Sequence, residues 1–483
     1  MAEQSIKKNY AYNVVFQIFS ILAPLITMPY VARVLEADFI GYYSYANSIT
    51  TYFSLFSSLG IAAYGLREVS LCRNDKQRCS EIFWELSTIR FMTTAAFAVA
   101  FVIAVIINGV NIDVYLACGI ILIAVAFDFT WFLQAMEEFK TLMLRNFVIK
   151  LISIVCIFIF VKEKEDLPIY IMIQMGSTLL ANLLIIPSVK KHLVPVNKRD
   201  LCYSQHFRQI LIYFVPAIAS SVYTVLDRTM LGVLTRSTLE NGYYEQAHKV
   251  INVMLAVITS LNVIVGVRTT YLFGQGDDER VKKYIKKTFK FMSLVSMPMI
   301  FGLVACARNF VPLFFGEGYD KVAPVLMMFS PLVFIIGISN IIGTLYLTPS
   351  GQRAKANRVI IVGAAVNFIL NLILIPTFKS YGAVAASLAA EGVISLLYIQ
   401  LMHRYLTVWD VFKAAIKYVA IAFVMLVVVQ TIGLRWHSMG ALLTQVSVGA
   451  AIYIIGLLVT RDEIVFEEIK KFKDAINKRR AQK

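Results

Sequence analysis

Apolar runs long enough to form membrane-spanning helices follow one another along almost the whole chain. A helix crosses the ~30 Å hydrocarbon core of a bilayer in about 20 residues, and these runs lack the two-residue alternation of membrane β-barrel strands. The pattern predicts fourteen spans, at about 14–34, 43–63, 84–107, 113–134, 146–161, 168–188, 209–234, 243–267, 288–307, 322–347, 357–376, 382–402, 413–433 and 439–459.

The composition favours a membrane protein and excludes other classes. Hydrophobic residues make up 58% of the 483 positions and charged residues 16%, and the mean hydropathy is +0.70. A soluble globular protein carries about 25% charged residues, and a disordered chain has a much lower apolar content. We therefore expect an all-α, polytopic membrane protein with about 14 transmembrane helices.

The positions of Lys and Arg predict the orientation of these spans. The chain has 46 Lys and Arg against 30 Asp and Glu. With the N-terminus inside, 34 of the basic residues fall in inner segments and 8 in outer loops. Basic residues favour the cytoplasmic side, so both termini are expected there. An anionic inner leaflet then explains most of the basic surplus, and nucleic acid is not an expected partner.

Segments outside the spans show amphipathic helical spacing. In the tail 461–483, apolar residues recur at 465, 469, 472 and 476, and a shorter pattern covers 281–288. Both are expected to lie as surface helices on the inner leaflet. The six cysteines have the spacing of neither a disulfide framework nor a metal site, so we expect no metal. No cofactor is expected either.

Two sequence motifs recur at one common offset. The segment 41–46, which begins Gly41-Tyr42-Tyr43, returns at 242–247, and the Gly-x-Arg motif at 65–67 returns at 266–268. The second and eighth spans are thus equivalent, and spans 1–6 and 7–12 form two copies with the same orientation. Parallel repeats of this kind build transporters whose substrate path lies between two lobes.

The repeat predicts the domain organisation. We expect a six-helix lobe at 1–190, a second at 205–403, an additional helix pair at 411–460 and the tail at 461–483. Prolines within spans, Pro24 and Pro216 in the first span of each copy among them, are expected to kink their helices.

Ionisable side chains inside spans need a partner or a water-filled cavity, because each costs at least about 2.5 kcal/mol at mid-bilayer. Glu85 lies near a span end, where it can snorkel to the interface. In the hairpin of spans seven and eight, Asp227 and Lys249 lie at the same depth, and Arg228 and Glu245 lie close to them. A closed structural network, Asp227–Lys249 and Arg228–Glu245, is one interpretation. For Arg228 and Lys249 we favour a role as cations that line a cavity.

The other candidate residues are spread over both lobes. Arg33 and Arg90 are further candidate cavity cations, and Arg67 and Arg268, equivalent in the repeat, are expected near the inner mouth. Asp128 is a candidate for a coupling or structural ion pair. Glu391 lies beside small residues in span twelve, where it either carries a proton or makes a helix–helix hydrogen bond.

Several motifs in order resemble the Wzx-type polysaccharide flippases. They extend from the fourth span to the twelfth and consist of Asp128-Phe-Thr-Trp-Phe-Leu-Gln-Ala-Met-Glu-Glu-Phe-Lys140 with Arg145-Asn146, Pro216…Tyr223-Thr-Val-Leu-Asp-Arg-Thr-Met-Leu-Gly232, Gly242-Tyr-Tyr-Glu245…Lys249, Phe314-Phe-Gly-Glu317, Asn367…Asn371…Ile375-Pro376 and Gly382-Ala383…Glu391. One position departs from the family: Val267-Arg268 stands where the family usually has Pro-Arg.

The resemblance implies two six-helix lobes of the multidrug/oligosaccharidyl-lipid/polysaccharide exporter superfamily. It implies transfer of undecaprenyl-pyrophosphate-linked oligosaccharide repeat units across the bacterial plasma membrane, in contact with other polysaccharide-assembly membrane proteins. Tyr30, Tyr42, Tyr223 and Trp131 could stack on sugars, although an interfacial aromatic belt or core packing is the favoured interpretation for each. A coupling ion, H+ or Na+, is left open.

Two alternatives are weighed against a flippase. An exporter of amphipathic drugs coupled to a cation would need a carboxylate-rich cavity, whereas several of the candidates are cations. A membrane glycosyltransferase or polymerase would need positioned acids or bases on a sizeable outer loop, and the outer loops are short. The chain also lacks a G-x-x-x-x-G-K-[ST] phosphate-binding loop. We therefore expect a transporter without a catalytic site.

Overall fold

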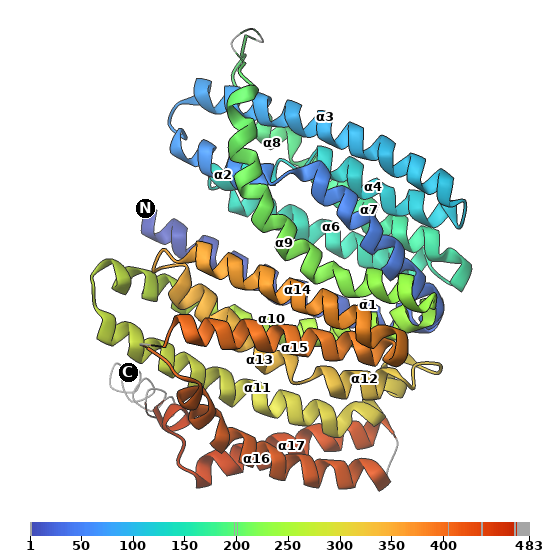
Figure 1. Cartoon of the computed structure of the whole chain (residues 1–483), viewed down its shortest axis with the longest axis vertical. Coiled ribbons are helices and arrows are strands. Elements are labelled where there is room, and N and C mark those ends of the chain that lie inside the picture. The colour runs from blue at the N-terminus through green and yellow to red at the C-terminus, as the bar shows by residue number, and fades with distance from the viewer. Residues whose placement is uncertain are drawn as a thin grey trace, which may run out of the picture. The chain divides into compact units, whose positions relative to one another are not determined.

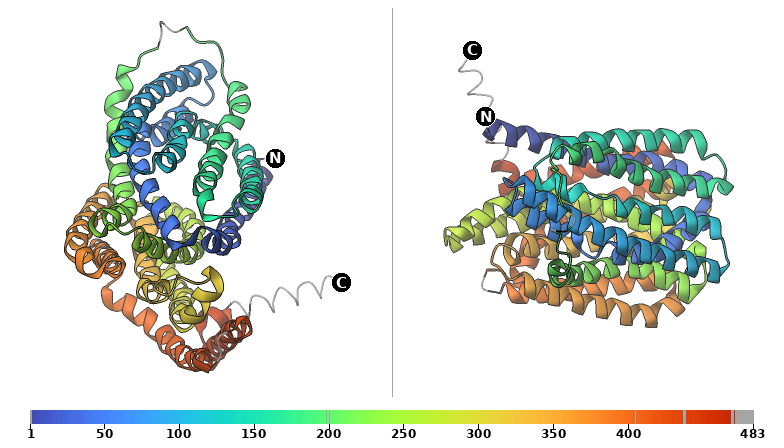
Figure 2. Two further views of the ribbon diagram at one scale, coloured as in Figure 1. Left: turned by 90° about the vertical axis from the view of Figure 1, so that its right-hand side faces the viewer. Right: turned by 90° about the horizontal axis from the view of Figure 1, so that it is seen from above.

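A computed structural model describes residues 2–197, 199, 201–403, 405–435, 438–467 and 470. The described residues are almost entirely helical and include no β-strand. The chain divides into two compact units, Met1–Glu245 and Gln246–Lys483. Within each unit the long helices run roughly side by side (Figures 1 and 2).

The first unit is built around the long N-terminal helix. Its elements are α1 (Ala2–Ser58), α2 (Ile61–Leu71), α3 (Lys76–Asn108), α4 (Ile112–Ala126), α5 (Thr130–Ala135), α6 (Phe139–Phe160), η1 (Lys164–Asp166), α7 (Leu167–Leu184), α8 (Ile186–Lys190), α9 (Ser204–Thr235) and the start of α10 (Thr238–Gly274). Helix α1 contacts α3, α4, α6 and α9, and α4 packs against α7 (Figure 1).

Helix α1 consists of two helices that meet at one residue. Glu36 has φ 60° and ψ 166°, a conformation that is unusual for a residue with a side chain. The predicted first and second spans are therefore joined by a single-residue turn, which is shorter than the predicted loop. Lys164 Nζ lies 3.8 Å from Glu36 Oε1 at this turn.

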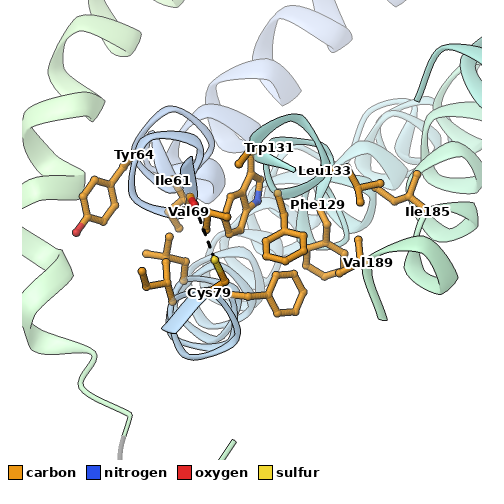
Figure 3. Close-up of a cluster of buried hydrophobic side chains, with 14 of the residues drawn as sticks. Ile61, Tyr64, Val69, Cys79, Phe129, Trp131, Leu133, Ile185 and Val189 are labelled. Atoms are coloured by element: carbon orange, nitrogen blue, oxygen red, sulfur yellow. Dashed lines mark hydrogen bonds between the residues drawn. The ribbon is translucent and has the colours of Figure 1, made fainter. Parts of the chain in front are cut away.

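An aromatic cluster forms the core of the first unit between α2, α3 and α5 (Figure 3). Trp131 of α5 is 2% exposed and stacks near Phe83 of α3, with ring centroids 6.1 Å apart. Gly65 of α2 lies against the indole, since a Cβ there would be 2.5 Å from the ring. For Trp131 the packing interpretation is thus confirmed.

The second unit follows from the remainder of α10. Its elements are α11 (Asp278–Phe315), α12 (Val322–Phe329), α13 (Leu332–Ile342), the π-helix η3 (Gly343–Leu347), α14 (Arg353–Phe378), α15 (Ser380–Leu401), α16 (Val408–Arg435) and α17 (Met439–Val459). Helix α14 packs on α15, and α11 packs on both α16 and α17.

The predicted tenth span, 322–347, is present as one apolar stretch, and it is interrupted between α12 and α13 at Pro331, as expected for a proline within a span. One prediction changes in this unit. The separate surface helix predicted at 281–288 is wrong, since these residues belong to the uninterrupted 38-residue helix α11. Residues 468, 469 and 471–483 of the predicted amphipathic tail lie outside the described residues.

Among the described residues, eleven helical stretches are long and apolar enough to cross a membrane. One of them, Ala23–Leu71, contains part of the first predicted span and all of the second. Helices α9 and α10, predicted as the seventh and eighth spans, are not among the eleven. The multi-pass membrane fold is confirmed. The number of fourteen spans stays a prediction, as does the division into lobes at 190 and 205.

Candidate functional site

The site begins at a close crossing of α1 with the start of α10. A Cβ added to Gly41 would lie 1.7 Å from the Thr238 carbonyl oxygen, and one added to Gly242 would lie 1.9 Å from the Ala37 carbonyl oxygen. Gly41 and Gly242 are equivalent in the repeat, and so are Ala37 and Thr238. The contact is therefore reciprocal, as expected when two equivalent helices cross at a two-fold axis. Only glycine permits this approach of the two backbones.

One helical turn beyond the crossing, a buried carboxylate receives two donors. Ser44 Oγ of α1 donates to Glu245 Oε2 over 3.1 Å, and Arg228 Nε of α9 lies 2.7 Å from the same oxygen. Glu245 is 8% exposed and the Arg228 side chain 18%. The Arg228–Glu245 pair of the closed-network interpretation is thus present, and the cavity-lining role that the sequence favoured for Arg228 stays a prediction. A buried ion pair of this kind is stable only when both charges keep their partners.

Neighbouring residues extend the polar contacts from α9 to α1. Tyr244 donates its hydroxyl to Asp227 Oδ2 over 2.6 Å, and Asp227 is 6% exposed. Thr229 Oγ1 donates to Ser48 Oγ over 2.9 Å and lies 3.2 Å from the Tyr52 hydroxyl. We call Ser44, Ser48, Asp227, Arg228, Thr229, Tyr244 and Glu245 the crossing network.

Lys249 lies one turn beyond Glu245 on α10 and is partly buried. It belongs to the second unit, whereas Asp227 belongs to the first. Their predicted pairing stays a prediction.

Arg90 and Asp128 form a second intramembrane pair. Arg90, on α3, is 1% exposed, and its Nη1 donates to the Asp128 carbonyl and lies 3.9 Å from Asp128 Oδ2. Asp128 lies in the break between α4 and α5, where its carboxylate accepts the Thr130 N–H over 3.1 Å. Arg90 thus supplies a donor to backbone that a helix would otherwise satisfy. Contact of Arg90 with a substrate stays a prediction. The geometry favours a role in which Arg90 positions the break between α4 and α5.

The other three candidate arginines have exposed side chains. Arg33 is exposed on α1, three residues before the turn at Glu36. Arg67 of α2 and Arg268 of α10 are both exposed, and Arg67 Nη1 lies 3.4 Å from Glu68 Oε1. The predicted roles of these three arginines stay predictions.

In the second unit, Glu391 of α15 is 7% exposed and contacts another helix. Ser339 Oγ of α13 donates to Glu391 Oε2 over 3.5 Å. On the neighbouring α14, the fully buried Asn371 donates from Nδ2 to Asn367 Oδ1 over 3.1 Å. The helix–helix hydrogen bond predicted for Glu391 is present, and proton transfer by this residue stays a prediction.

A buried cluster that the sequence analysis missed joins α3 to α9. Glu85 is fully buried, its Oε2 lies 2.6 Å from His206 Nε2, and its Oε1 accepts the Cys202 N–H over 2.6 Å. His206 Nδ1 lies 2.9 Å from the Tyr64 hydroxyl of α2. The prediction that Glu85 snorkels to the interface is wrong, because the segment before α9 covers it. The sequence held one signal for this cluster. Glu85 and His206 both lie near the predicted inner end of a span, the third and the seventh respectively.

Comparison with known proteins places the chain in a family. Residues 6–267, more than half of the chain, match the polysaccharide biosynthesis protein family. The chain belongs to this family. A protein of Escherichia coli (strain K12) named as an O-antigen transporter is 24% identical over 401 residues, which cover 81% of this chain and 95% of that protein. The lipopolysaccharide biosynthesis protein WzxC of the same strain is 23% identical over 200 residues, 40% of this chain and 38% of WzxC.

Solved structures share the fold of this family member. The lipid II flippase MurJ, in an inward closed conformation, has a TM-score of 0.73 at 18% identity, with 93% of this chain and 99% of MurJ covered. An outward-facing multidrug resistance MATE family transporter of the MOP superfamily has a TM-score of 0.51 at 12% identity, with 82% and 95% covered. The likeness confirms the polytopic helical fold that the resemblance implied.

The departure from the family at Val267 has a structural counterpart. Helix α10 continues through Val267 and Arg268 to Gly274. A proline at 267 would remove a backbone donor and favour a break there. In this family member α10 therefore presents Arg268 from a continuous helix.

Proposed function

We propose that this member of the polysaccharide biosynthesis protein family is a flippase for undecaprenyl-pyrophosphate-linked oligosaccharide repeat units. It acts in the bacterial plasma membrane with both termini in the cytoplasm. The observation that carries the proposal is the alignment with the O-antigen transporter, which covers 95% of that relative. The names of WzxC and of a Haloferax volcanii glycan biosynthesis flippase, 22% identical over 195 residues, support it.

The physical task of such a flippase is to carry a charged headgroup through hydrocarbon. An unpaired pyrophosphate is very costly there, because burial removes its water and counterions. Cationic side chains in a hydrated path replace these partners, while the polyprenyl tail stays in lipid. We assign this role to Arg228, Lys249 and Arg33, and the guarding of the inner mouth to Arg67 and Arg268.

Arg228 is the central residue of the proposed mechanism. Its guanidinium is held by Glu245 at 2.7 Å within the first unit. An arriving pyrophosphate competes with the Glu245 carboxylate for this cation, and Glu245 re-forms the pair when the substrate leaves. Arg90 acts indirectly, by holding the break between α4 and α5. Rocking of two lobes then exposes the path to each side in turn.

Glu245, Asp227, Asp128 and Glu391 are the candidate carboxylates for a coupling ion, H+ or Na+. Contact with other membrane proteins of polysaccharide assembly is part of the same proposal.

The test is deletion of the gene in the native host, followed by analysis of lipid-linked intermediates. We expect oligosaccharide-linked undecaprenyl pyrophosphate to accumulate on the cytoplasmic face and surface glycan to be lost. Both defects should be reversed by the wild-type chain. Loss of drug resistance with normal surface glycan would instead identify a drug exporter, and turnover of the lipid substrate in detergent would identify an enzyme.

The orientation is tested by cysteine labelling in a Cys202→Ser background. Val110, 57% exposed after α3, is predicted outside, and Ala354, exposed at the start of α14, is predicted inside. Val110→Cys should react with an impermeant reagent in intact cells, and Ala354→Cys only after permeabilisation. The reverse pattern would contradict the proposed orientation.

A further inference from the structure

A basic pocket in the second unit is lined by none of the candidate residues discussed above. It has a volume of about 450 Å3 and lies between the start of α11, the start of α16 and the segment that follows α17. Its charged lining residues are five basic and three acidic: Lys286, Lys290, Lys413, Lys417, Arg461, Asp410, Asp462 and Glu463. We call it the α11–α16 pocket.

Ion pairs within this pocket use all three carboxylates. Lys286 Nζ lies 2.9 Å from Asp410 Oδ1, Lys290 Nζ 2.7 Å from Glu463 Oε2, and Lys417 Nζ 2.6 Å from Asp462 Oδ2. These pairs tie α11 to α16 and to the segment after α17. Two cations are left over.

Those two cations are Lys413 and Arg461, both with exposed side chains. Among the residues that the structure describes, neither is paired with a carboxylate. Arg461 has φ 47°, a left-handed conformation that favours glycine at the end of a helix. The chain thus carries a long cationic side chain at a position where glycine would relieve the backbone. Strained positions of this kind are common at binding sites.

The surroundings of the pocket are those of a lipid headgroup region. Its inner wall is apolar and contains Phe289 and Leu406, which are 1% and 2% exposed. Beside it on α16, Trp409 and Phe412 are 69% and 55% exposed and stack with ring centroids 5.9 Å apart. Exposed tryptophan is typical of the membrane–water interface. We therefore expect the pocket to lie at the depth of phospholipid phosphates.

We propose that the α11–α16 pocket binds the phosphate of an anionic membrane phospholipid, with Lys413 and Arg461 as its ligands. Basic pockets between transmembrane helices at this level suit anionic headgroups. Arg461 can form two parallel hydrogen bonds to phosphate oxygens, and Lys413 adds a point charge. The bound lipid would join α16 to the segment after α17, so it would stabilise the C-terminal helix pair on α11.

The experiment measures the thermal unfolding midpoint of the purified full-length protein in detergent, with and without phosphatidylglycerol. Ligand that binds only the folded state raises this midpoint as its concentration exceeds Kd. We expect phosphatidylglycerol to raise it, and phosphatidylcholine or inorganic phosphate at equal concentration to have little effect. In the double variant Lys413→Gln/Arg461→Gln the rise should fall by at least half. Native mass spectrometry should show one fewer bound phosphatidylglycerol.

The controls separate this site from general electrostatics. Lys283→Gln removes an exposed charge from the same part of α11, outside the pocket lining, and should leave the response unchanged. Lys413→Arg should retain it. A full response in the double variant would overturn the proposal, as would equal stabilisation by inorganic phosphate, which would mean that the pocket selects phosphate without lipid. Because binding is measured without transport, either result leaves the proposed flippase function untouched.

Discussion

Ser44 and Glu245 occupy equivalent positions of the internal repeat, 201 residues apart, and are joined by a 3.1 Å hydrogen bond. The equivalent helices therefore meet each other directly, at the Gly41–Gly242 crossing and again one turn later. Where the two copies of the repeat are in contact, equivalent positions can carry different side chains. Here one copy supplies the hydroxyl and the other the carboxylate, and the carboxylate also holds Arg228.

Gly41→Ala should destabilise the first unit, because its methyl group would lie 1.7 Å from the Thr238 carbonyl oxygen. Forcing a group into well-packed structure costs about 1–3 kcal/mol, and backbone cannot move aside as a side chain can. The measurement is the thermal unfolding midpoint in detergent. Gly176→Ala on α7 is the matched control, since nothing lies within 4 Å of a Cβ there. Equal midpoints for the two variants would contradict the crossing.

Arg228→Ala should abolish glycan export while the protein still inserts in the membrane. The loss has two sources: the substrate loses its cation, and Glu245 is left buried without its ion-pair partner, which by itself costs about 3–5 kcal/mol. Export is measured as surface glycan in the deletion strain, and insertion as protein in the membrane fraction.

The double variant Arg228→Met/Glu245→Leu separates these two sources. Replacing both members of a buried pair by apolar residues is often neutral for stability. If Arg228 contacts substrate, the double variant should be stable but inactive. Normal export by the double variant would show that the pair is structural.

His206→Ala should lower the unfolding midpoint strongly, because it removes the His206 Nε2 atom that lies 2.6 Å from Oε2 of the fully buried Glu85. Loss of one partner of a buried, hydrogen-bonded charge costs several kcal/mol. Tyr64→Phe should have a smaller effect of about 1 kcal/mol, since it removes one hydrogen bond and keeps the ring. His403→Ala, at an exposed histidine, is the control. A midpoint for His206→Ala that matches this control would contradict the cluster.

The Asp462–Lys417 pair predicts a pH dependence of stability. Burial alone would raise the pKa of Asp462, but hydrogen bonds from Lys417, Tyr418 and the Val465 N–H hold this pKa below its ordinary value. A carboxyl with a lowered pKa stabilises the folded state above its unfolded pKa of about 3.9 and loses this contribution as the pH falls further. Asp462→Asn should therefore lower the midpoint at pH 7.

The difference between wild type and Asp462→Asn should shrink below about pH 4, as the wild-type carboxyl is protonated. Glu463→Gln is the control: its side chain is 77% exposed and its pair with Lys290 lies at the surface, so it should have little effect at either pH. A constant difference between wild type and Asp462→Asn across this range would refute the assignment.

The sequence by itself determined that the chain is a multi-pass helical membrane protein of the flippase type. Hydropathy over about 20 residues is a local property, and it needs no knowledge of which helices are neighbours. The motif that begins at Gly41 and returns at Gly242 can likewise be recognised from the sequence alone. The Arg228–Glu245 pair could be named as one of two interpretations, because a short loop sets the depth of both side chains in one hairpin.

Only the tertiary structure decided which partners the other buried charges take. Arg90 meets the break at Asp128, and Glu85 meets His206 from a helix more than a hundred positions further along the chain. Such choices depend on the rotation and depth of each helix, which are set by side-chain packing across the unit. The periodicity of one helix carries no information on these quantities. A charge that appears able to reach water can therefore be closed off by a segment that is distant in the sequence.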